Sequence, residues 1–273
     1  MMAPEMIEPF RSQFEELIRN GAGARDVHDA AASVGYAGTE KTSVSDVFLS
    51  REVSRVETHQ KALCPLIERV VGRCSSVLDV GCSTGGSTVA LALSPVLAAE
   101  EVVGVDPNGE SIDAARIRAK GYPAVTGRAR FERITAGQAL PFPDAKFDLC
   151  VTISVLEFIT HPAGRVFFAS ELQRVTRPGG YVFLATPTPL RLREFHSRRW
   201  LGHQIRRDGF PWSSSRRSVN KMFSRCDRIP IQRADVEQMA HRRELPAGLL
   251  AALAPLFAPL LPWQKFLFRR NGM

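Results

Sequence analysis

The stretch 77-VLDVGCSTGGSTVALA-92 constrains the fold of this chain more than any other segment. An apolar run ends in Asp79, small residues follow from Gly81 to Gly86, and a second apolar run begins at Val89 with helical spacing. Small residues let the backbone approach a ligand closely at the carboxyl end of a strand, where doubly wound sheets bind nucleotides. The segment therefore predicts a strand, a glycine loop and a helix that together bind a nucleotide.

Short apolar runs alternate with helical patterns between Ser76 and Thr186. Such alternation is typical of βαβ units and a parallel sheet. The expected strands are 76–80, 102–106, 130–134, 147–154 and 181–186, with closing strands at 229–233 and 264–270.

The segments on either side of this region have different patterns. Residues 1–70 show helical spacings, as at Phe10 and Phe14, and predict an N-terminal helical cap. Residues 190–228 are rich in arginine and contain two tryptophans, which favours an inserted lid over a sheet element. The predicted organisation is a cap at 1–70, a core at 71–189, a lid at 190–228, and closing strands with a helix of the core at 229–273.

The composition is that of a globular protein in a reducing compartment. The 273 residues are 44% hydrophobic and 23% charged, so the chain can bury a sizeable core. The five cysteines are odd in number, and no two have the C-x-x-C spacing of a zinc or redox site. The amino-terminal segment lacks the basic start and apolar core of a signal peptide. We therefore expect a cytoplasmic protein that holds no metal.

One segment is long and apolar enough to raise the question of a membrane. Residues 245–263 carry no charge, but four prolines interrupt them: Pro246, Pro255, Pro259 and Pro262. Prolines break or kink a spanning helix. We expect this segment to pack on the core of the protein, with contact to a membrane surface as the alternative.

The glycine loop argues against a dinucleotide. A dinucleotide site has the pattern G-x-G-x-x-G, whereas this loop reads G-x-x-x-G-G with Ser83 at the middle position. The Tyr-x-x-x-Lys pair of short-chain oxidoreductases is missing as well, because none of the three tyrosines has a lysine four residues later. Hydride transfer is therefore disfavoured.

Four segments in order resemble the motifs of the class I S-adenosylmethionine-dependent methyltransferases. The first is Asp79-Val80-Gly81-Cys82-Ser83-Thr84-Gly85, which resembles the acidic residue and glycine loop after the first strand, and the others are 102-VVGVDPNGESIDAAR-116, 135-TAGQALPFPDAKFDLCVTISVLEFI-159 and 172-LQRVTRPGGYVFLATP-187. The resemblance implies an α/β fold with a Rossmann-like, doubly wound and mostly parallel sheet and an antiparallel closing strand. It also implies S-adenosylmethionine as cofactor, S-adenosylhomocysteine as product, and no metal.

The resemblance assigns the cofactor site residue by residue. Asp106 follows the glycine loop by about twenty residues, a position from which a carboxylate accepts hydrogen bonds from both ribose hydroxyls. Ala136 departs from the family, which usually has an aspartate there for the adenine amino group, so Gly137 and Gln138 would have to hold adenine instead. The implied cofactor-binding residues are Asp79, Gly81, Cys82, Ser83, Gly85, Asp106, Pro107, Ala136, Gly137, Gln138, Ser154 and Val155.

By the same resemblance, residues just after the fourth strand line the methyl pocket. Glu157 and His161 are the candidates for a general base, should the acceptor need one. Each has a structural alternative, because Glu157 fits a helix cap and His161 precedes Pro162 at an expected helix start. The residues predicted to contact substrate are Phe158, Arg198, Arg199 and Trp200.

Three functions remain open at this point, and methylation of a small metabolite or natural product is the first. The net charge of +8 and pI near 9.7 suggest a nucleic-acid methyltransferase as the second. Against it, Ser154-Val155-Leu156-Glu157 lacks the Asn/Asp-Pro-Pro-aromatic signature of enzymes that methylate base amino groups, and an anionic or lipid-like small acceptor would explain the arginines as well. The third is a module that binds the cofactor without catalysis. The arginines in question are Arg191, Arg193, Arg198, Arg199, Arg206, Arg207, Arg216 and Arg217.

Overall fold

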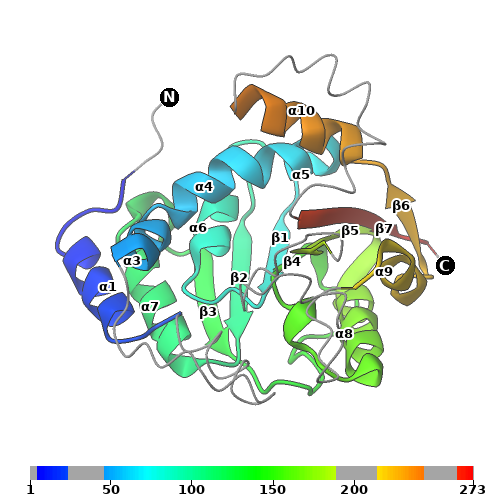
Figure 1. Cartoon of the computed structure of the whole chain (residues 1–273), viewed down its shortest axis with the longest axis horizontal. Coiled ribbons are helices and arrows are strands. Elements are labelled where there is room, and N and C mark those ends of the chain that lie inside the picture. The colour runs from blue at the N-terminus through cyan, green and yellow to red at the C-terminus, as the bar shows by residue number, and fades with distance from the viewer. Residues whose placement is uncertain (1–4, 24–45, 189–213, 243–262, 273) are drawn as a thin grey trace. The chain divides into compact units, whose positions relative to one another are not determined.

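The computed structural model describes residues 5–23, 46–188, 214–242 and 263–272. These residues form two compact units, Met1–Gln138 and Ala139–Met273. The described strands form a seven-stranded sheet in the order β3-β2-β1-β4-β5-β7-β6 (Figure 1). Most neighbouring pairs are parallel and the last two strands are antiparallel, which confirms the predicted Rossmann-like α/β class.

The first unit contains β1, which leads into the glycine loop, and the two strands beside it in the sheet. β1 (Ser76–Val80) pairs in parallel with β2 (Glu101–Asp106), and β2 pairs in parallel with β3 (Ala129–Arg133). Beyond their first residues β1 and β2 are buried throughout, as expected of parallel strands covered on both faces. The register puts Asp79 opposite Gly104, near the carboxyl ends of both strands. These positions agree with the expected strands at 76–80, 102–106 and 130–134.

Helices cover this part of the sheet. α6 (Gly86–Ala92) follows the glycine loop, and α7 (Gly109–Lys120) begins at Asn108, whose side chain accepts a hydrogen bond from the backbone N–H of Ser111. This N-cap satisfies one of the free N–H groups of the first turn. A short 3₁₀ helix, η1 (Pro123–Val125), leads into β3.

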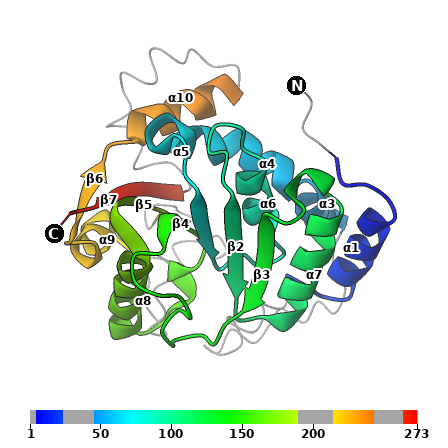
Figure 2. The same cartoon turned by 180° about the vertical axis from the view of Figure 1, so that it is seen from behind.

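The N-terminal residues of the first unit are helical, as predicted for the described part of the cap. α1 (Phe10–Arg19) buries Phe14 and Ile18 and packs against α7 (Figure 2). α3 (Asp46–Val53), α4 (Arg55–Ala62) and α5 (Cys64–Val71) follow, and α4 packs against α6. The helices of the cap therefore contact α6, which follows the glycine loop, and α7, which packs against that loop.

The second unit contains the other four strands. β4 (Phe147–Ile153) pairs in parallel with β5 (Thr176–Pro187), β7 (Trp263–Arg270) pairs antiparallel with β5, and β6 (Cys226–Ile229) pairs antiparallel with β7. Its helices are η2 (Leu156–Phe158), α8 (Pro162–Val175), α9 (Arg216–Met222) and α10 (Gln232–Arg242). Phe223 stacks on Phe268 at 4.5 Å between ring centroids, in the core of this unit.

One expected closing strand is placed wrongly by the sequence pattern. The strand predicted at 229–233 lies instead at Cys226–Ile229, and α10 has begun by Gln232. Pro230 explains the early end, because proline cannot donate to a strand ladder. This strand lies mostly within the range 190–228 that the sequence assigned to a lid.

Other predictions fall on residues that are not described. Arg198, Arg199 and Trp200 lie outside the described residues, as does the apolar segment 245–263 except for Trp263, which begins β7. Within the described ranges, no helix is both long and apolar enough to cross a membrane. The division into cap, core, lid and closing segment stays a prediction.

Candidate functional site

The loop between β1 and α6 has the backbone conformation that its glycines predict. Gly81 and Gly85 have φ angles of +77° and +79°, in the left-handed region that glycine adopts without strain. The N–H groups of Gly81 and Cys82 both donate to the carbonyl of Val105, at 2.8 and 3.1 Å. Backbone hydrogen bonds therefore attach the start of the loop to the end of β2.

Gly85 also has no room for a side chain. A Cβ atom at this position would lie 2.8 Å from Cβ of Ala115 and 2.8 Å from the ring of Phe131. Real Cβ atoms do not approach other atoms so closely, so β3 and α7 press directly on the start of α6. The glycine is required both by its dihedral angles and by packing.

Ser83 stands where the methyltransferase motif has a glycine, and it keeps the glycine-like conformation. Its φ angle is +46°, which costs a non-glycine residue roughly 1 kcal/mol. Its N–H donates to Oδ2 of Asp106 at 2.9 Å, a charge-assisted bond that holds the strained residue in place. The departure from the motif therefore changes the side chain and preserves the course of the backbone.

Asp79, the penultimate residue of β1, is a buried carboxylate with one oxygen that lacks a hydrogen-bond partner in the described part of the chain. Its side chain is 1% exposed, and Oδ2 accepts hydrogen bonds from the hydroxyls of Ser87 at 2.6 Å and Thr88 at 2.7 Å. Oδ1 has no hydrogen-bond partner within the described part of the chain. Burial raises the pKa of Asp79 to about 6 although both hydroxyls oppose the shift. A buried acceptor without a partner costs free energy, so Oδ1 is suited to a donor on a ligand, above all a positively charged one.

Asp106 ends β2 and supports the same loop. Oδ1 accepts the N–H of Asn108 and Oδ2 accepts the N–H of Ser83, both at 2.9 Å. These two bonds fix the orientation of the carboxylate at the end of β2. Pro107 follows with an exposed side chain, and its carbonyl accepts the Nε–H of Arg133 at 3.1 Å.

The predicted adenine segment forms a turn after β3. Gly137 has a φ angle of +75°, and the N–H of Gln138 donates to the carbonyl of Thr135 at 3.3 Å. Ala136, Gly137 and Gln138 are all exposed. The turn offers backbone groups and the Gln138 amide, and it places no carboxylate at position 136.

A buried polar cluster behind the glycine loop was not predicted. Thr84 in the loop donates to Oε2 of Glu52 on α3 at 2.6 Å, and Nη2 of Arg118 on α7 donates to Oγ1 of Thr84 at 3.3 Å and to the backbone carbonyl of Glu52 at 2.8 Å. All three side chains are at most 2% exposed. Arg118 also lies 4.3 Å from the ring of Phe14, and burial lowers its pKa to about 10. The cluster ties the N-terminal helices to the loop.

A sequence signal for Arg118 did exist. Ser111, Ala115 and Arg118 recur at the i, i+4, i+7 spacing of one helix face, which is the buried face of α7. An arginine on such a face requires a partner inside the protein. No local pattern identifies Glu52 as that partner, because it lies 66 residues away along the chain.

The second unit holds the candidates for catalysis. After β4, Ser154 has a φ angle of +58°, and its N–H donates to the carbonyl of Ala185 at 3.0 Å. Val155 precedes η2, which contains Glu157 and Phe158. Glu157 is 1% exposed and accepts a hydrogen bond from the Thr186 hydroxyl at 3.2 Å.

Glu157 and His161 differ in accessibility. Burial raises the pKa of Glu157 to about 8, so at neutral pH this group carries a proton and does not act as a base. His161 is exposed at the N-cap of α8, directly before Pro162, and makes no side-chain capping bond. The predicted substrate residues Arg198, Arg199 and Trp200 cannot be placed against either. Within the described part of the chain, no group of three or more His, Cys, Asp or Glu side chains is arranged to hold a metal ion.

Comparison with known proteins agrees with this geometry. Residues 78–184 match the family model described as "Methyltransferase domain". No curated protein matches the chain in sequence.

Three solved structures illustrate the likeness in fold. The [4+2]-cyclase SpnF is 16% identical over 100% of this chain and 99% of its own, with a TM-score of 0.54. A putative methyltransferase complexed with the Trm112 methyltransferase activator of Haloferax volcanii is 14% identical over 82% and 95%, with a TM-score of 0.54. The N-methyltransferase NodS of Bradyrhizobium japonicum, in complex with S-adenosylhomocysteine, is 13% identical over 90% and 98%, with a TM-score of 0.50.

The sequence match and the structural likeness are independent, and both cover the strands that carry the glycine loop, Asp79 and Asp106. The matched domain spans β1 through most of β5. Residues 78–184 of the chain are thus a methyltransferase domain, built on a Rossmann-like α/β sheet.

Proposed function

We propose that this methyltransferase transfers the methyl group of S-adenosylmethionine to a small-molecule acceptor, a metabolite or natural product. The observation that carries the cofactor assignment is the buried Oδ1 of Asp79, which lacks a partner among the described residues beside a loop of left-handed residues. The small-molecule assignment is supported by the sequence after β4, which lacks the signature of base-amino methylation.

In this proposal the first unit supplies most of the cofactor contacts. Oδ1 of Asp79 accepts a hydrogen bond from the ammonium group of the cofactor, and Asp106 accepts from its ribose hydroxyls while it continues to hold Ser83. Gly81, Cys82 and Gly85 let the backbone approach the cofactor closely. The turn at Ala136, Gly137 and Gln138 contacts adenine through backbone groups, and Pro107, Ser154 and Val155 complete the proposed set.

The bound cofactor supplies a methyl group on a positively charged sulfur, and the chemistry is an in-line displacement by the acceptor. The task of the protein is then to align the acceptor and to exclude water. Phe158, Arg198, Arg199 and Trp200 are proposed to contact the acceptor. An anionic or lipid-like acceptor would suit the arginines.

If the methylated atom of the acceptor carries a proton, a base must remove that proton. Glu157 serves as a general base only above its pKa of about 8 and is buried, whereas the side chain of His161 is exposed. Of the two, we propose His161. Replacing His161 with Gln should lower kcat at pH 7 and leave cofactor affinity unchanged, and an unchanged kcat would remove His161 from the mechanism.

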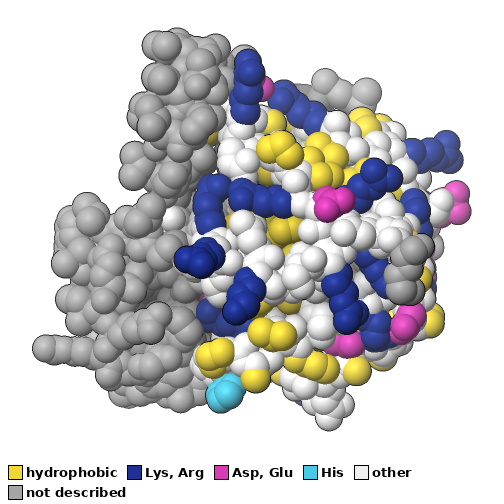
Figure 3. Space-filling model, turned by 90° about the vertical axis from the view of Figure 1, so that its right-hand side faces the viewer, with side chains coloured by type: hydrophobic (Ala, Val, Ile, Leu, Met, Phe, Trp, Pro, Cys, Tyr) yellow, Lys and Arg dark blue, Asp and Glu magenta, His cyan; other side chains and the backbone are white. Residues whose placement is uncertain are grey.

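A nucleic-acid acceptor is the second candidate, and one observation favours it. Figure 3 views the side on which Figure 1 shows β6 and α9, and Lys and Arg side chains are spread across it. In and next to α9, β6 and β7, seven basic residues make no ion pair with an acidic group in the described ranges: Arg216, Arg217, Lys221, Arg225, Arg228, Arg269 and Arg270. Exposed arginines are also stable when simply solvated, so this surface ranks below the small-molecule proposal.

The experiment that separates these functions is a methyl-transfer assay with isotopically labelled cofactor. Purified protein is incubated with a metabolite extract or with total RNA, and products heavier by one methyl group are detected by mass spectrometry. Labelled metabolites support the proposal, and label only in RNA supports the second candidate. Cofactor binding without any methylated product would favour a non-catalytic module. A cytoplasmic location is part of the proposal and is supported by the five free cysteines.

A further inference from the structure

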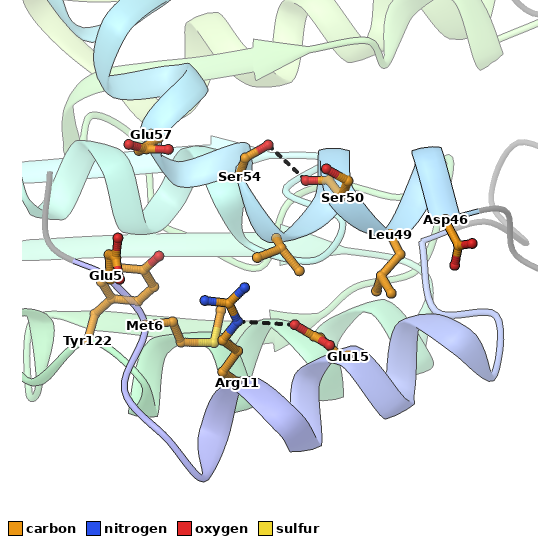
Figure 4. A pocket seen from close by; sticks show the side chains of 11 residues that line it. Glu5, Met6, Arg11, Glu15, Asp46, Leu49, Ser50, Ser54, Glu57 and Tyr122 are labelled. Carbon is orange, nitrogen blue, oxygen red and sulfur yellow. Dashed lines mark hydrogen bonds and ion pairs between the residues drawn. The ribbon is translucent and has the colours of Figure 1, made fainter.

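A pocket separate from the glycine loop lies among the N-terminal helices of the first unit (Figure 4). Its volume is about 400 Å³, and α1, α3 and α4 line it together with residues 5–6 and Tyr122. Leu49, Ser50 and Val53 of α3 face the pocket, whereas Glu52 of the same helix binds Thr84 in the glycine loop. The pocket is therefore on the other side of α3 from the loop.

The inner wall of this pocket is apolar. Met6 and Leu49 are each 7% exposed, and Val53 and the Tyr122 ring continue the surface. Met6 is packed tightly, because a Cβ atom at Gly121 would lie 2.2 Å from its Cγ. Transfer of a hydrocarbon chain from water onto this wall would be favourable in free energy, because it buries apolar surface.

The rim of the pocket is acidic. It carries four carboxylates, Glu5, Glu15, Asp46 and Glu57, against one guanidinium, that of Arg11. Three of these carboxylates form ion pairs in which at least one of the two side chains is exposed. The pairs are Glu15 with Arg11 at 3.1 Å, Asp46 with Arg19 at 3.6 Å, and Glu57 with Lys61 at 3.5 Å. Such pairs contribute little stability and exchange readily for another cation. Glu5 makes no ion pair within the described part of the chain.

Tyr122 contributes a hydroxyl to the lining of the pocket. Its side chain is 5% exposed, and its hydroxyl has no hydrogen bond among the described residues. Burial raises the pKa of this hydroxyl, the charge of Arg118 opposes that rise, and Glu57 and Glu5 raise the pKa further against the smaller effect of Arg11. In Figure 4 Tyr122 lies at the same end of the pocket as Glu5 and Glu57, while Asp46 lies at the far end.

We propose that this pocket binds a primary aliphatic ammonium ion. The ammonium group has three N–H donors, and Glu5, Glu57 and the Tyr122 hydroxyl present three acceptor groups at one end of the pocket. The alkyl chain lies along Met6 and Val53 towards Leu49. The same group occurs on free alkylamines and on lysine side chains, and binding at this site is independent of the proposed acceptor.

The first test uses the unmodified full-length protein and calorimetry. Hexan-1-amine is compared with hexan-1-ol, which has the same chain and no charge, and with N-acetyl-lysine amide. We expect hexan-1-amine to bind at least tenfold more tightly than hexan-1-ol, and the affinity of n-alkylamines to rise about three- to fourfold per methylene from propyl to hexyl. Tighter binding of the capped lysine than of hexan-1-amine would identify a lysine side chain as the natural ligand, and the reverse would identify a free amine. Equal binding of the amine and the alcohol, or binding of neither, would overturn the proposal.

Variants then locate the bound amine. Glu5→Gln and Tyr122→Phe should each weaken hexan-1-amine binding about tenfold, whereas Arg11→Gln should tighten it by removing a competing cation. Glu100→Gln is the matched control, because Glu100 is an exposed carboxylate outside the pocket and its replacement changes the net charge equally. Circular dichroism and melting temperature confirm that each variant is folded. If Arg11→Gln weakens binding, or if Glu100→Gln has the same effect as Glu5→Gln, the assigned site is wrong.

Discussion

Two carboxyl groups that follow parallel strands, Asp79 at the end of β1 and Glu157 after β4, are equally buried and differ in their surroundings. Asp79 receives two hydroxyl hydrogen bonds shorter than 2.8 Å, and its pKa is raised only to about 6. Glu157 receives the Thr186 hydroxyl at 3.2 Å, and its pKa is raised to about 8 because burial outweighs its hydrogen bonds with Thr186, Ser154 and the backbone and the charge of Arg165. Equal exposure thus does not decide the charge of a carboxyl group, because the balance between desolvation and the compensating groups differs from one site to the next.

The consequence is a difference in function. Near neutral pH Asp79 is mostly ionised and suits a cationic ligand, whereas Glu157 is mostly neutral and suits a structural or hydrogen-donating role. The glycine loop around Asp79 is also fixed by backbone hydrogen bonds and close packing, which limits the conformational entropy that the loop would lose on binding a ligand.

The largest expected effect concerns the charge of Glu157. Its pKa is raised from 4.5 in the unfolded chain to about 8 in the folded protein, so its contribution to stability is full below pH 4.5 and is lost as pH rises to 8. Between these values the free energy of unfolding should fall by about 1.4 kcal/mol per pH unit from this one proton. Glu157→Gln should remove that slope, as measured by urea unfolding at pH 5, 6, 7 and 8.

Asp79→Asn is the matched comparison for this series. The pKa of Asp79 is raised from 3.8 to about 6, so its contribution is lost with rising pH between those two values and adds no slope from pH 6 to 8. If Asp79→Asn changes the slope above pH 7 and Glu157→Gln does not, the contrast between the two carboxyl groups is reversed.

The next effect concerns the packing of the loop. Gly85→Ala adds a Cβ atom 2.8 Å from Ala115 and Phe131 at a φ angle of +79°, so it should destabilise the fold by about 2–4 kcal/mol. Gly127 has a φ angle of +78° with nothing within 4 Å of its Cβ position, so Gly127→Ala should cost only about 1 kcal/mol. Equal costs in chemical unfolding would show that the contacts of Gly85 do not constrain the loop.

The effect on cofactor binding is of intermediate size. Asp106→Ala removes the acceptor for the ribose hydroxyls and should weaken S-adenosylmethionine binding by about 1.5–3 kcal/mol, or roughly 10- to 150-fold. Asp113→Ala is the control, because Asp113 is exposed on α7 and pairs only with Arg116 nearby. Calorimetric affinities of the two folded variants that do not differ would remove Asp106 from the site.

The smallest expected effect is that of Ser83→Gly. Glycine relieves the strain at φ +46° but makes the unfolded chain more flexible, and each contribution is about 1 kcal/mol. The free energy of unfolding should therefore stay within about 1 kcal/mol of the unmodified protein. A loss of 2 kcal/mol or more would mean that the Ser83 side chain itself holds the loop.

The contrast between local and distant interactions also explains which features the sequence could predict. β1, β2 and β7 lie within one residue of their predicted positions, because apolar runs and glycine turns are local signals. The proposed cofactor site was assigned from local signals as well, because Asp79, Gly81 and Gly85 lie in one sequence motif and Asp106 in the next.

Features that depend on distant contacts were not predictable. The cluster of Glu52, Thr84 and Arg118 joins three helices or loops that no local pattern connects. The raised pKa of Glu157 comes from burial by surrounding segments, which a single sequence does not reveal.

The misplaced strand at 229–233 has a local cause, since the Ile-Pro-Ile pattern resembles a strand although Pro230 cannot take part in one.

The most direct test of the cofactor site is the affinity for S-adenosylmethionine between pH 5 and pH 7, measured by calorimetry. A cationic group bound to Oδ1 favours the ionised form of Asp79, so binding at pH 5 must release the proton that Asp79 holds below its pKa of about 6. We predict that the Kd of the unmodified protein falls about tenfold from pH 5 to pH 7, and that Asp79→Asn binds more weakly with no dependence on pH in this range. A constant Kd in the unmodified protein, with equal affinity in Asp79→Asn, would contradict the assignment of Asp79 to the cofactor site.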